Sequence, residues 1–233
     1  PIDAPLKTST FVVFATDTTG FNASSGAVMI EIGAVKIEDG VITDRFDEFI
    51  NPGFHIPDNI TALTEISDDM VSSADTEENV TKRFLEWTGD LPMVAHNAKF
   101  DISFIEMAMK KYNLGKFTNA VIDTLELSRS LDRGFARHSL SALVKRYNVP
   151  FDEESHHRAD YDAEGTALVF NKMISKLENE KIYNVNELQN LVSKEELFKF
   201  GRTYHFNAIA KDRVGLKNLF KIISLANTTY LYK

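Results

Sequence analysis

Three aspartates occupy positions where acidic side chains can act together. Asp17 follows the apolar run FVVFA, Asp101 follows the run PMVAHN, and Asp162 lies in HHRADYDAE. We expect both runs to be buried strands, so that these acids lie where an open α/β sheet gathers its ligands. Carboxylate oxygens are preferred by Mg²⁺ and Mn²⁺. Two such ions about 4 Å apart can stabilise the attacking and leaving oxygens of a phosphodiester hydrolysis.

A histidine lies close to the third aspartate. His157 precedes Asp162 by five residues, and we expect it in the loop that enters a helix. A neutral imidazole there, with an ordinary pKa near ~6.5, can take the proton from an attacking water. Taken singly, each residue also has a structural explanation. An aspartate in the first turn of a helix is favoured by the helix dipole, Asp17 suits a turn, and a lone histidine is usually at the surface.

The elements that would position these residues follow an α/β order. Short apolar runs predict strands over 11–15, 28–37, 41–50, 92–97 and 119–124. Asp39-Gly40 between the second and third of these predicts a hairpin. Apolar residues at helical spacing predict helices over 77–88, 99–112, 125–131, 139–147 and 159–177. This order favours a mixed α/β sheet flanked by helices, with three antiparallel strands first.

The composition limits the classes of protein that this chain can represent. Its 233 residues, 43% of them hydrophobic, can form one large domain with an ordinary core. A net charge of -8 excludes a strongly basic nucleic-acid coat protein, but not a nuclease whose bound metals supply positive charge. The lack of cysteine excludes disulfides and thiol catalysis. Without a membrane span or a signal peptide, we expect a cytoplasmic protein with no membrane partner.

Three segments together resemble the exonuclease motifs of the DEDDh 3′–5′ exonuclease family, a group within the RNase H-like superfamily. They are FVVFATDTTG, HNAKFD and HHRADYDAE, in that order. The second and third match the family patterns at His96, Asn97, Phe100, Asp101, His157, Ala159 and Asp162. The resemblance covers residues 8–178. It implies an RNase H-like mixed five-stranded sheet flanked by helices, and a two-metal site that holds Mg²⁺ or Mn²⁺.

The resemblance also implies roles for individual residues. Asp17, Asp101 and Asp162 would hold the metal ions, and His157 would deprotonate the attacking water. The implied substrate contacts are Thr18, Thr19, Gly20, Phe21, His96, Asn97 and Phe100. Ile66 is the apolar tip of NITALTEISDD, which resembles the family loop that packs against the last bases of the strand. The alternative for Ile66 is a core residue beneath that loop.

The first motif departs from the family pattern. The family has Asp-x-Glu where this chain has Ala15-Thr16-Asp17. Alanine offers no oxygen to a cation, and Asp17 is one methylene shorter than glutamate. In the family the first carboxylate bridges both metals, so we expect weak metal binding and slow or absent cleavage. An engineered substitution and a natural one at positions 15 and 17 would leave the same sequence.

Further segments are similar to the exonuclease domains of PolC-type bacterial replicative DNA polymerases. They are VIDTLELSRSL, HSLSALVKRY and SHHRADYDAE, and the tail RTYHFNAIAKD onward resembles the place where the PHP domain of those polymerases resumes. We therefore predict an exonuclease domain over 1–180, a helical linker over 181–200 and a PHP fragment over 201–233. The implied partners are a single-stranded or frayed 3′ end of DNA and the PHP and polymerase regions of a longer chain.

The leading interpretation is metal-dependent 3′–5′ hydrolysis of DNA in proofreading, with release of nucleoside monophosphates. An RNA exonuclease of the same family shares these motifs, although the PHP-like tail favours DNA replication. The second class is a catalytically inactive module that binds DNA or a partner, which the degenerate first motif would favour. A PHP-type phosphoesterase is disfavoured, because the tail offers only His205 and Asp212 as ligands.

Overall fold

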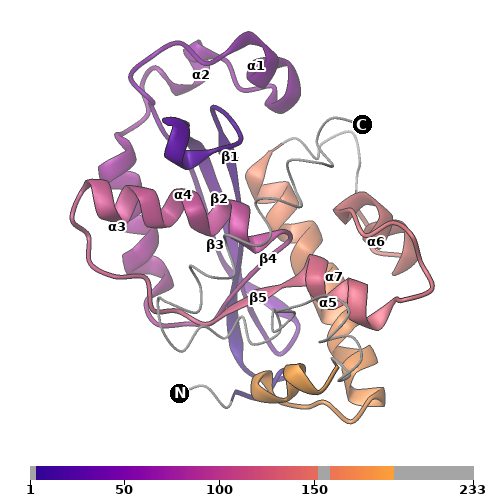
Figure 1. The fold of residues 1–233 in the computed structure, drawn as a ribbon. Coiled ribbons are helices and arrows are strands. Elements are labelled where there is room, and N and C mark those ends of the chain that lie inside the picture. Colours follow the sequence, from indigo (N-terminus) through magenta and orange to yellow (C-terminus); the bar gives the residue numbers. More distant parts are fainter. Residues whose placement is uncertain (1–3, 152–157, 192–233) are drawn as a thin grey trace.

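The computed structural model describes residues 4–151 and 158–191, which form a five-stranded sheet with helices on both faces (Figure 1). The strands are β1 (Thr10–Thr18), β2 (Met29–Glu38), β3 (Val41–Phe49), β4 (Met93–Ala95) and β5 (Val121–Asp123). Their order across the sheet is β3-β2-β1-β4-β5. The first three are antiparallel, whereas β4 and β5 run parallel to β1. The predicted RNase H-like mixed sheet is therefore confirmed.

The hairpin between β2 and β3 follows from its two turn residues. Asp39 and Gly40 have φ angles of 50° and 78°. Positive φ at both central positions is what a two-residue type I′ turn requires, and Asp-Gly satisfies it at low cost. The hairpin predicted from this dipeptide is confirmed.

The helices cover the two faces unequally. They are α1 (Asp58–Thr64), α2 (Asp68–Val71), α3 (Glu77–Thr88), α4 (Ala98–Lys111), α5 (Thr124–Leu131), α6 (Leu140–Arg146) and α7 (Ala159–Asn179), with 3-10 turns η1 (Ala23–Ser25) and η3 (Val185–Leu191). The clusters of buried side chains place α3 and α4 on one face, and α5, α6 and α7 on the other. Figure 1 shows α1 and α2 beyond the end of the sheet where β1 stops. Among these described helices, none has the length and apolarity needed to span a bilayer.

Strand β1 sends alternate side chains into two separate cores. Val13 packs in the cluster shared with α7, whereas Val12 packs in the cluster shared with α3 and α4. Because successive residues of a strand point to opposite faces, Asp17 continues the α7 side and Thr16 the opposite side. The carboxyl end of β1 can therefore meet side chains that arrive from both layers of helices.

The described part of the predicted linker packs on the main core. Ile182, Val185 and Leu188 are buried in the same cluster as the inner face of α7. The backbone N–H of Leu6 donates to the carbonyl of Tyr183 at 2.8 Å. Residues 182–188 are thus integrated with the domain that precedes them. The predicted PHP fragment, 201–233, lies outside the described residues.

Candidate active site

Asp101 reaches the end of β1 from the first turn of α4. Its Oδ1 accepts hydrogen bonds from the backbone N–H of Thr16 at 3.0 Å and from the Thr16 hydroxyl at 2.5 Å. Only 6% of Asp101 is exposed. Burial raises its pKa to about 7, although the bonds from Thr16 oppose that shift. The α4 layer thus presents one carboxyl group to the strand end.

The start of α4 is held in place by the last residue of β5. The Asp123 carboxylate accepts from the backbone N–H groups of Asn97 at 2.9 Å and Ala98 at 3.2 Å. It also accepts from Leu125, in the first turn of α5, at 2.9 Å. A carboxylate at two helix N-termini satisfies backbone donors and the helix dipoles together. Asp123 therefore fixes the helix that carries Asp101.

Asp17 on β1 and Asp162 on α7 lie near Asp101 from the opposite face of the sheet, and we call these three side chains the carboxylate group. Burial is the largest cause that raises the pKa of Asp17 to about 9, followed by a hydrogen bond with Glu31 and the charges of Glu31, Asp162 and Asp101. Burial, and then the charge of Asp101, raises the pKa of Asp162 to about 7. Charges act on one another this way only when they are close. The structure therefore brings the three predicted aspartates together.

Glu31 on β2 anchors the start of α7 beside Asp17. It faces Asp17 across the ladder and is completely buried. One carboxylate oxygen accepts from the backbone N–H of Ala159 at 2.7 Å. The other accepts from Arg158 Nε at 3.0 Å and Nη2 at 2.9 Å. Sequence analysis missed this residue, although a glutamate inside the apolar run VMIEIGAVKI is unusual enough to have been a signal.

Gly33 allows α7 to lie directly against β2. A Cβ atom at this position would lie 2.2 Å from the backbone nitrogen of Asp160 and 2.4 Å from the carbonyl carbon of Ala159. Only glycine permits so close an approach of two backbones. Asp162 lies in the same first turn of α7, so this contact sets its distance from β1.

The carboxylate group fits a divalent cation in its chemistry. One oxygen of Asp17, Oδ2, is buried and has no hydrogen-bond donor. Burial is the largest cause that raises the pKa of all three aspartates, so their charged forms are unfavourable in this environment. A divalent cation would supply positive charge and favour the ionised carboxylates. Ala15, on the same face of β1 as Asp17, contributes no oxygen.

A second acidic cluster lies next to the first. Within the described part of the chain, the only acidic or histidine trio with ligand atoms all within 4.8 Å of one another is Glu31, Asp47 and Asp160. Arg158 already binds Glu31, and its Nη2 lies 3.7 Å from Asp47 Oδ2. An arginine therefore supplies the positive charge in this cluster. The carboxylate oxygens of Asp17, Asp101 and Asp162 are spaced more widely than those of this trio.

The threonines after Asp17 stabilise their own loop. The Thr18 hydroxyl donates to the carbonyl of Gly20 at 2.7 Å. Thr19 donates its N–H to the Val28 carbonyl at 2.8 Å and accepts from the Val28 N–H at 3.0 Å. Both threonines are buried. These bonds close the loop between β1 and β2, and Phe21 is half exposed. The contact of this loop with a nucleotide stays a prediction.

The prediction of an exposed tip at Ile66 is wrong. Ile66 is fully buried in a third cluster, which it shares with Ile56 and Ile60. The cause is Glu65, whose φ of 61° ends α1 and turns the chain inward. The exposed large apolar residue of this segment is Leu63, which is 54% exposed on α1.

The remaining predicted contacts lie around the start of α4. Burial lowers the pKa of His96 to about 4, and its Nδ1 lies 2.9 Å from the Thr124 hydroxyl. The neutral ring can form hydrogen bonds but carries no charge for a phosphate. Phe100 packs against Phe104 with ring centres 5.0 Å apart. His157, the predicted base, lies outside the described residues.

A mixed sheet that gathers carboxylates at the end of its central strand defines the class of RNase H-like nucleases. Residues 12–170 match the Exonuclease (RNase_T) family, and the chain belongs to that family. It is an exonuclease domain, as the three motifs predicted.

The curated relatives are much longer proteins. DNA polymerase III PolC-type from Staphylococcus saprophyticus and from Staphylococcus aureus are each 42% identical to this chain over all 233 residues. The chain spans only 16% of the length of either relative. The similarity to PolC-type sequences predicted above is confirmed, and it extends through the tail.

Solved structures share the fold. Exonuclease X in complex with 5′ overhanging duplex DNA has a TM-score of 0.57 and 25% identity, over 71% of this chain and 91% of that one. The nuclease domain of 3′hExo, a DEDDh family member bound to rAMP, has a TM-score of 0.63 over 78% of this chain and 98% of that one. At 16% identity, the second likeness shows the fold alone.

Proposed function

We propose that this chain is the 3′–5′ proofreading exonuclease domain of a replicative DNA polymerase. The observation that carries the proposal is the convergence of Asp17, Asp101 and Asp162 at the end of β1. The alignment of the whole chain with PolC-type polymerases supports a replicative context. Exonuclease X, whose structure holds duplex DNA, supports DNA as the substrate. The PHP and polymerase regions of a longer chain would be its partners, in the cytoplasm.

The chemistry would be hydrolysis of the last phosphodiester bond. Asp17, Asp101 and Asp162 would hold Mg²⁺ or Mn²⁺ ions, which when bound stabilise charge on the attacking and leaving oxygens. Thr16 orients Asp101 through two hydrogen bonds. His157 would accept the proton of the attacking water as the bond from phosphorus to the 3′ oxygen breaks. The products are a nucleoside 5′-monophosphate and a strand one nucleotide shorter.

Selectivity for errors would come from the state of the 3′ end. A mismatched terminus leaves the duplex at lower free-energy cost than a matched one. A chain with a net charge of -8 gains little from general attraction to phosphates. Affinity would therefore depend on the metal site, on contacts with unpaired bases and on the rest of the polymerase.

Ala15 supports an impaired form of this activity. Position 15 offers no carboxylate oxygen to a cation, and the ligand atoms of Asp17, Asp101 and Asp162 are not all within 4.8 Å of one another. The same observation favours a second candidate, a module that binds a frayed DNA end without cleaving it. The two candidates share a binding surface and differ only in turnover.

Cleavage of a 3′-mismatched primer, with and without Mn²⁺, tests the proposal. We expect the parent chain to be slow and the Ala15→Asp, Asp17→Glu double variant to be at least about 100-fold faster, since a transition-state contact of this kind is worth that much. Asp101→Asn in the double variant is the control that should remove the gain. An RNA primer of the same sequence decides between nucleic acids.

Two results would count against the proposal. Equal Mn²⁺ affinity and equal rates for the parent and the double variant would show that position 15 is not a metal ligand. A double variant that binds Mn²⁺ and primer yet releases no nucleotide would leave the binding module as the function.

A further inference from the structure

We propose that the surface formed by the end of α5, the α5–α6 connection and α6 binds the phosphate backbone of double-stranded DNA, an inference that rests on the function proposed above. We call residues 129–146 the basic surface. They include five Lys or Arg residues and one Asp, in a chain whose net charge is -8. The exposed cations among them are Arg129, Arg133, Arg137 and Lys145. None of the substrate contacts predicted from the motifs lies in this segment.

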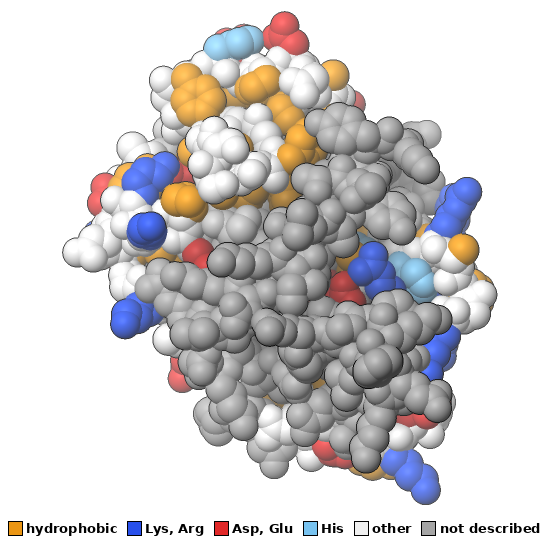
Figure 2. All heavy atoms as spheres, viewed as in Figure 1, with side chains coloured by type: hydrophobic (Ala, Val, Ile, Leu, Met, Phe, Trp, Pro, Cys, Tyr) orange, Lys and Arg blue, Asp and Glu red, His pale blue; other side chains and the backbone are white. Residues whose placement is uncertain are grey.

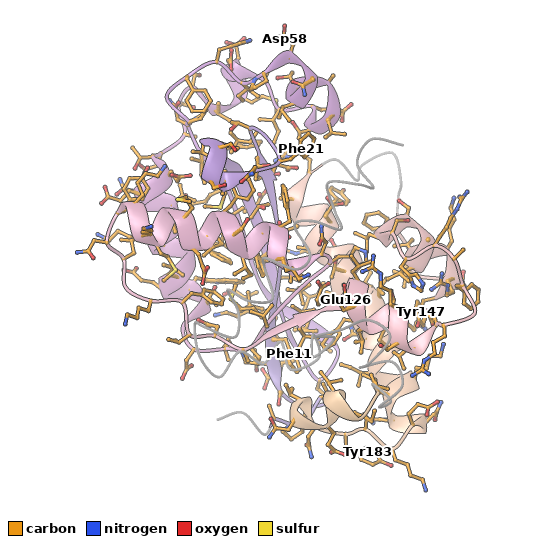
Figure 3. All side chains as sticks on the ribbon, viewed as in Figure 1. Phe11, Phe21, Asp58, Glu126, Tyr147 and Tyr183 are labelled. Atoms are coloured by element: carbon orange, nitrogen blue, oxygen red, sulfur yellow. The ribbon has the colours of Figure 1, made fainter. Side chains whose placement is uncertain are left out.

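The charges of the domain are distributed unevenly. Residues 46–81, which include α1 and α2, contain nine Asp or Glu residues and no Lys or Arg. Figure 2 shows Lys, Arg and His side chains along the right-hand edge of the molecule, over the region of α5 and α6. Figure 3 places Glu126, on α5, and Tyr147, which follows α6, on that side, away from Asp58 at the upper end. A polyanion is therefore repelled by one part of the domain and attracted by another, although the net charge is negative.

Contacts within the basic surface fix the backbone that carries its cations. The Nε2 atom of His138 lies 2.9 Å from the carbonyl oxygen of Phe135. Arg146 donates to the Asp132 carboxylate at 2.7 Å and to the backbone carbonyl of Arg137. The guanidinium carbon of Arg146 also lies 4.0 Å from the centre of the Phe135 ring. A surface whose backbone is already ordered loses less conformational entropy when a ligand binds.

Arg137 is the cation of this surface that is best placed to bind an external anion. Its side chain is exposed, and within the described part of the chain no hydrogen bond or ion pair joins that side chain to another residue. By contrast, Arg129 already binds Glu126 at 2.7 Å. A planar guanidinium can donate two parallel hydrogen bonds to the oxygens of one phosphate. Lys145, on α6, supplies a second exposed cation.

Bonds at the start of α5 connect the basic surface with the proposed active site. Asp123 accepts from the backbone N–H of Leu125, on α5, and from that of Ala98, on α4. Helix α4 carries Asp101. From this junction α5 extends over eight residues, or about 12 Å, which spans about three to four nucleotides of a DNA strand. The duplex that precedes a frayed 3′ end therefore comes within reach of the basic surface.

The charge density of a duplex suits this surface. Double-stranded DNA carries one negative charge per ~1.7 Å of its axis, about twice the density of a single strand. Each cation on the basic surface therefore meets more phosphate charge along a duplex than along a single strand. Phosphate contacts read no sequence, which is what a proofreading enzyme requires.

Salt-dependent binding of DNA to the full 233-residue chain in Mn²⁺ tests the inference. The probe is a fluorescent primer–template duplex with a frayed 3′ end, whose last linkage is a phosphorothioate to prevent cleavage. We expect Arg137→Gln to lower the slope of log Kd against log salt by about 0.9, and to weaken the Kd about eight-fold at ~0.1 M salt, because one phosphate contact contributes that much. Lys145→Gln should add a second decrease of the same size. The matched controls Lys82→Gln, on α3, and Lys116→Gln, before β5, each remove an exposed cation elsewhere and should leave the slope unchanged.

A single strand too short to span α5 separates the basic surface from the active site. Its Kd should be the same for the parent and for Arg137→Gln. A folded Arg137→Gln variant with the parent's slope on the duplex would overturn the inference alone, and so would an equal loss on the short strand. A polyglutamate peptide whose binding weakens in Arg137→Gln while duplex binding does not would assign the surface to an acidic protein instead. A parent chain that binds neither DNA would overturn the proposed function together with this inference.

Discussion

Replacing Gly33 with alanine should move Asp162, on α7, away from Asp17, on β1. The added Cβ would start 2.2 Å from the backbone nitrogen of Asp160, whereas ordinary contact begins at 3.4 Å. The clashing atoms belong to the backbone of Ala159 and Asp160, so rotation of a side chain cannot relieve the contact. The first turn of α7 would have to move by about 1.2 Å to restore ordinary contact, and Asp162 would move with it, away from Asp17.

Two measurable losses follow from that displacement. Overpacking typically costs about 1–3 kcal/mol, and a backbone clash belongs at the upper end of that range. For a domain of this size, ~3 kcal/mol lowers the midpoint of thermal unfolding by roughly 6–12 °C. A shift of about 1 Å in a reacting group can also cost about 100-fold in rate. We expect weaker Mn²⁺ binding for the same reason.

Thermal unfolding and Mn²⁺ calorimetry on the parent, Gly33→Ala and Gly134→Ala would test this reasoning. Gly134 is the matched control, because a Cβ there meets nothing within 4 Å; its replacement should change the unfolding free energy by less than about 1 kcal/mol. If Gly33→Ala unfolded and bound Mn²⁺ as the Gly134 control does, α7 would not be positioned by its contact with β2.

Two further predictions concern residues away from the site. The Asp132 side chain is fully buried and accepts hydrogen bonds from Arg146 at 2.7 Å, Lys176 at 2.5 Å and Tyr147 at 2.9 Å. We expect Asp132→Asn to lower the free energy of unfolding, measured in urea, by about 3–5 kcal/mol. A decrease below ~1 kcal/mol would contradict this. Both ring nitrogens of His55 face carboxylates, Nδ1 at 2.5 Å from Asp68 and Nε2 at 3.0 Å from Asp58, and the hydrogen bond with Asp68 is the main cause that raises the His55 pKa above 6.5. The stabilisation of the fold by charged His55 is complete below pH 6.5 and is lost as the pH rises through the raised pKa. An NMR titration of His55 with a midpoint at or below 6.5 would refute this.

Periodicity was sufficient to predict the elements that carry the site. Apolar runs or helical spacing mark all five strands and helices α3 to α7, and each was predicted near its observed bounds. Of the residues in helices α1 and α2, only Ile60, Thr64 and Val71 are buried, so no apolar repeat stands out from the loop around Pro52 and Pro57. That gap explains the error at Ile66, since the turn at Glu65 that buries it belongs to an element the pattern did not reveal.

The residues that position the site without belonging to a motif could not be predicted from the motifs. Glu31 matters because it lies opposite Asp17 on the neighbouring strand, and the register of these two strands follows from the folded sheet, not from a motif. Thr16 binds Asp101 across 85 positions of sequence. The motif residues mark where the chemistry converges, whereas these partners depend on how the layers pack.

Position 15 connects the stability of this domain with its chemistry. Burial first, and then the charges of neighbouring acids, raise the pKa to about 9 for Asp17 and to about 7 for Asp101 and Asp162, so the ionised carboxylates are unfavourable without a cation. A fourth carboxylate at position 15, on the same face of β1 as Asp17, would add to that repulsion. Alanine therefore relieves the metal-free fold by the same change that removes a metal ligand. Since a cation stabilises only the state it binds, the stability of the metal-free fold and the affinity for a metal make opposite demands on this residue.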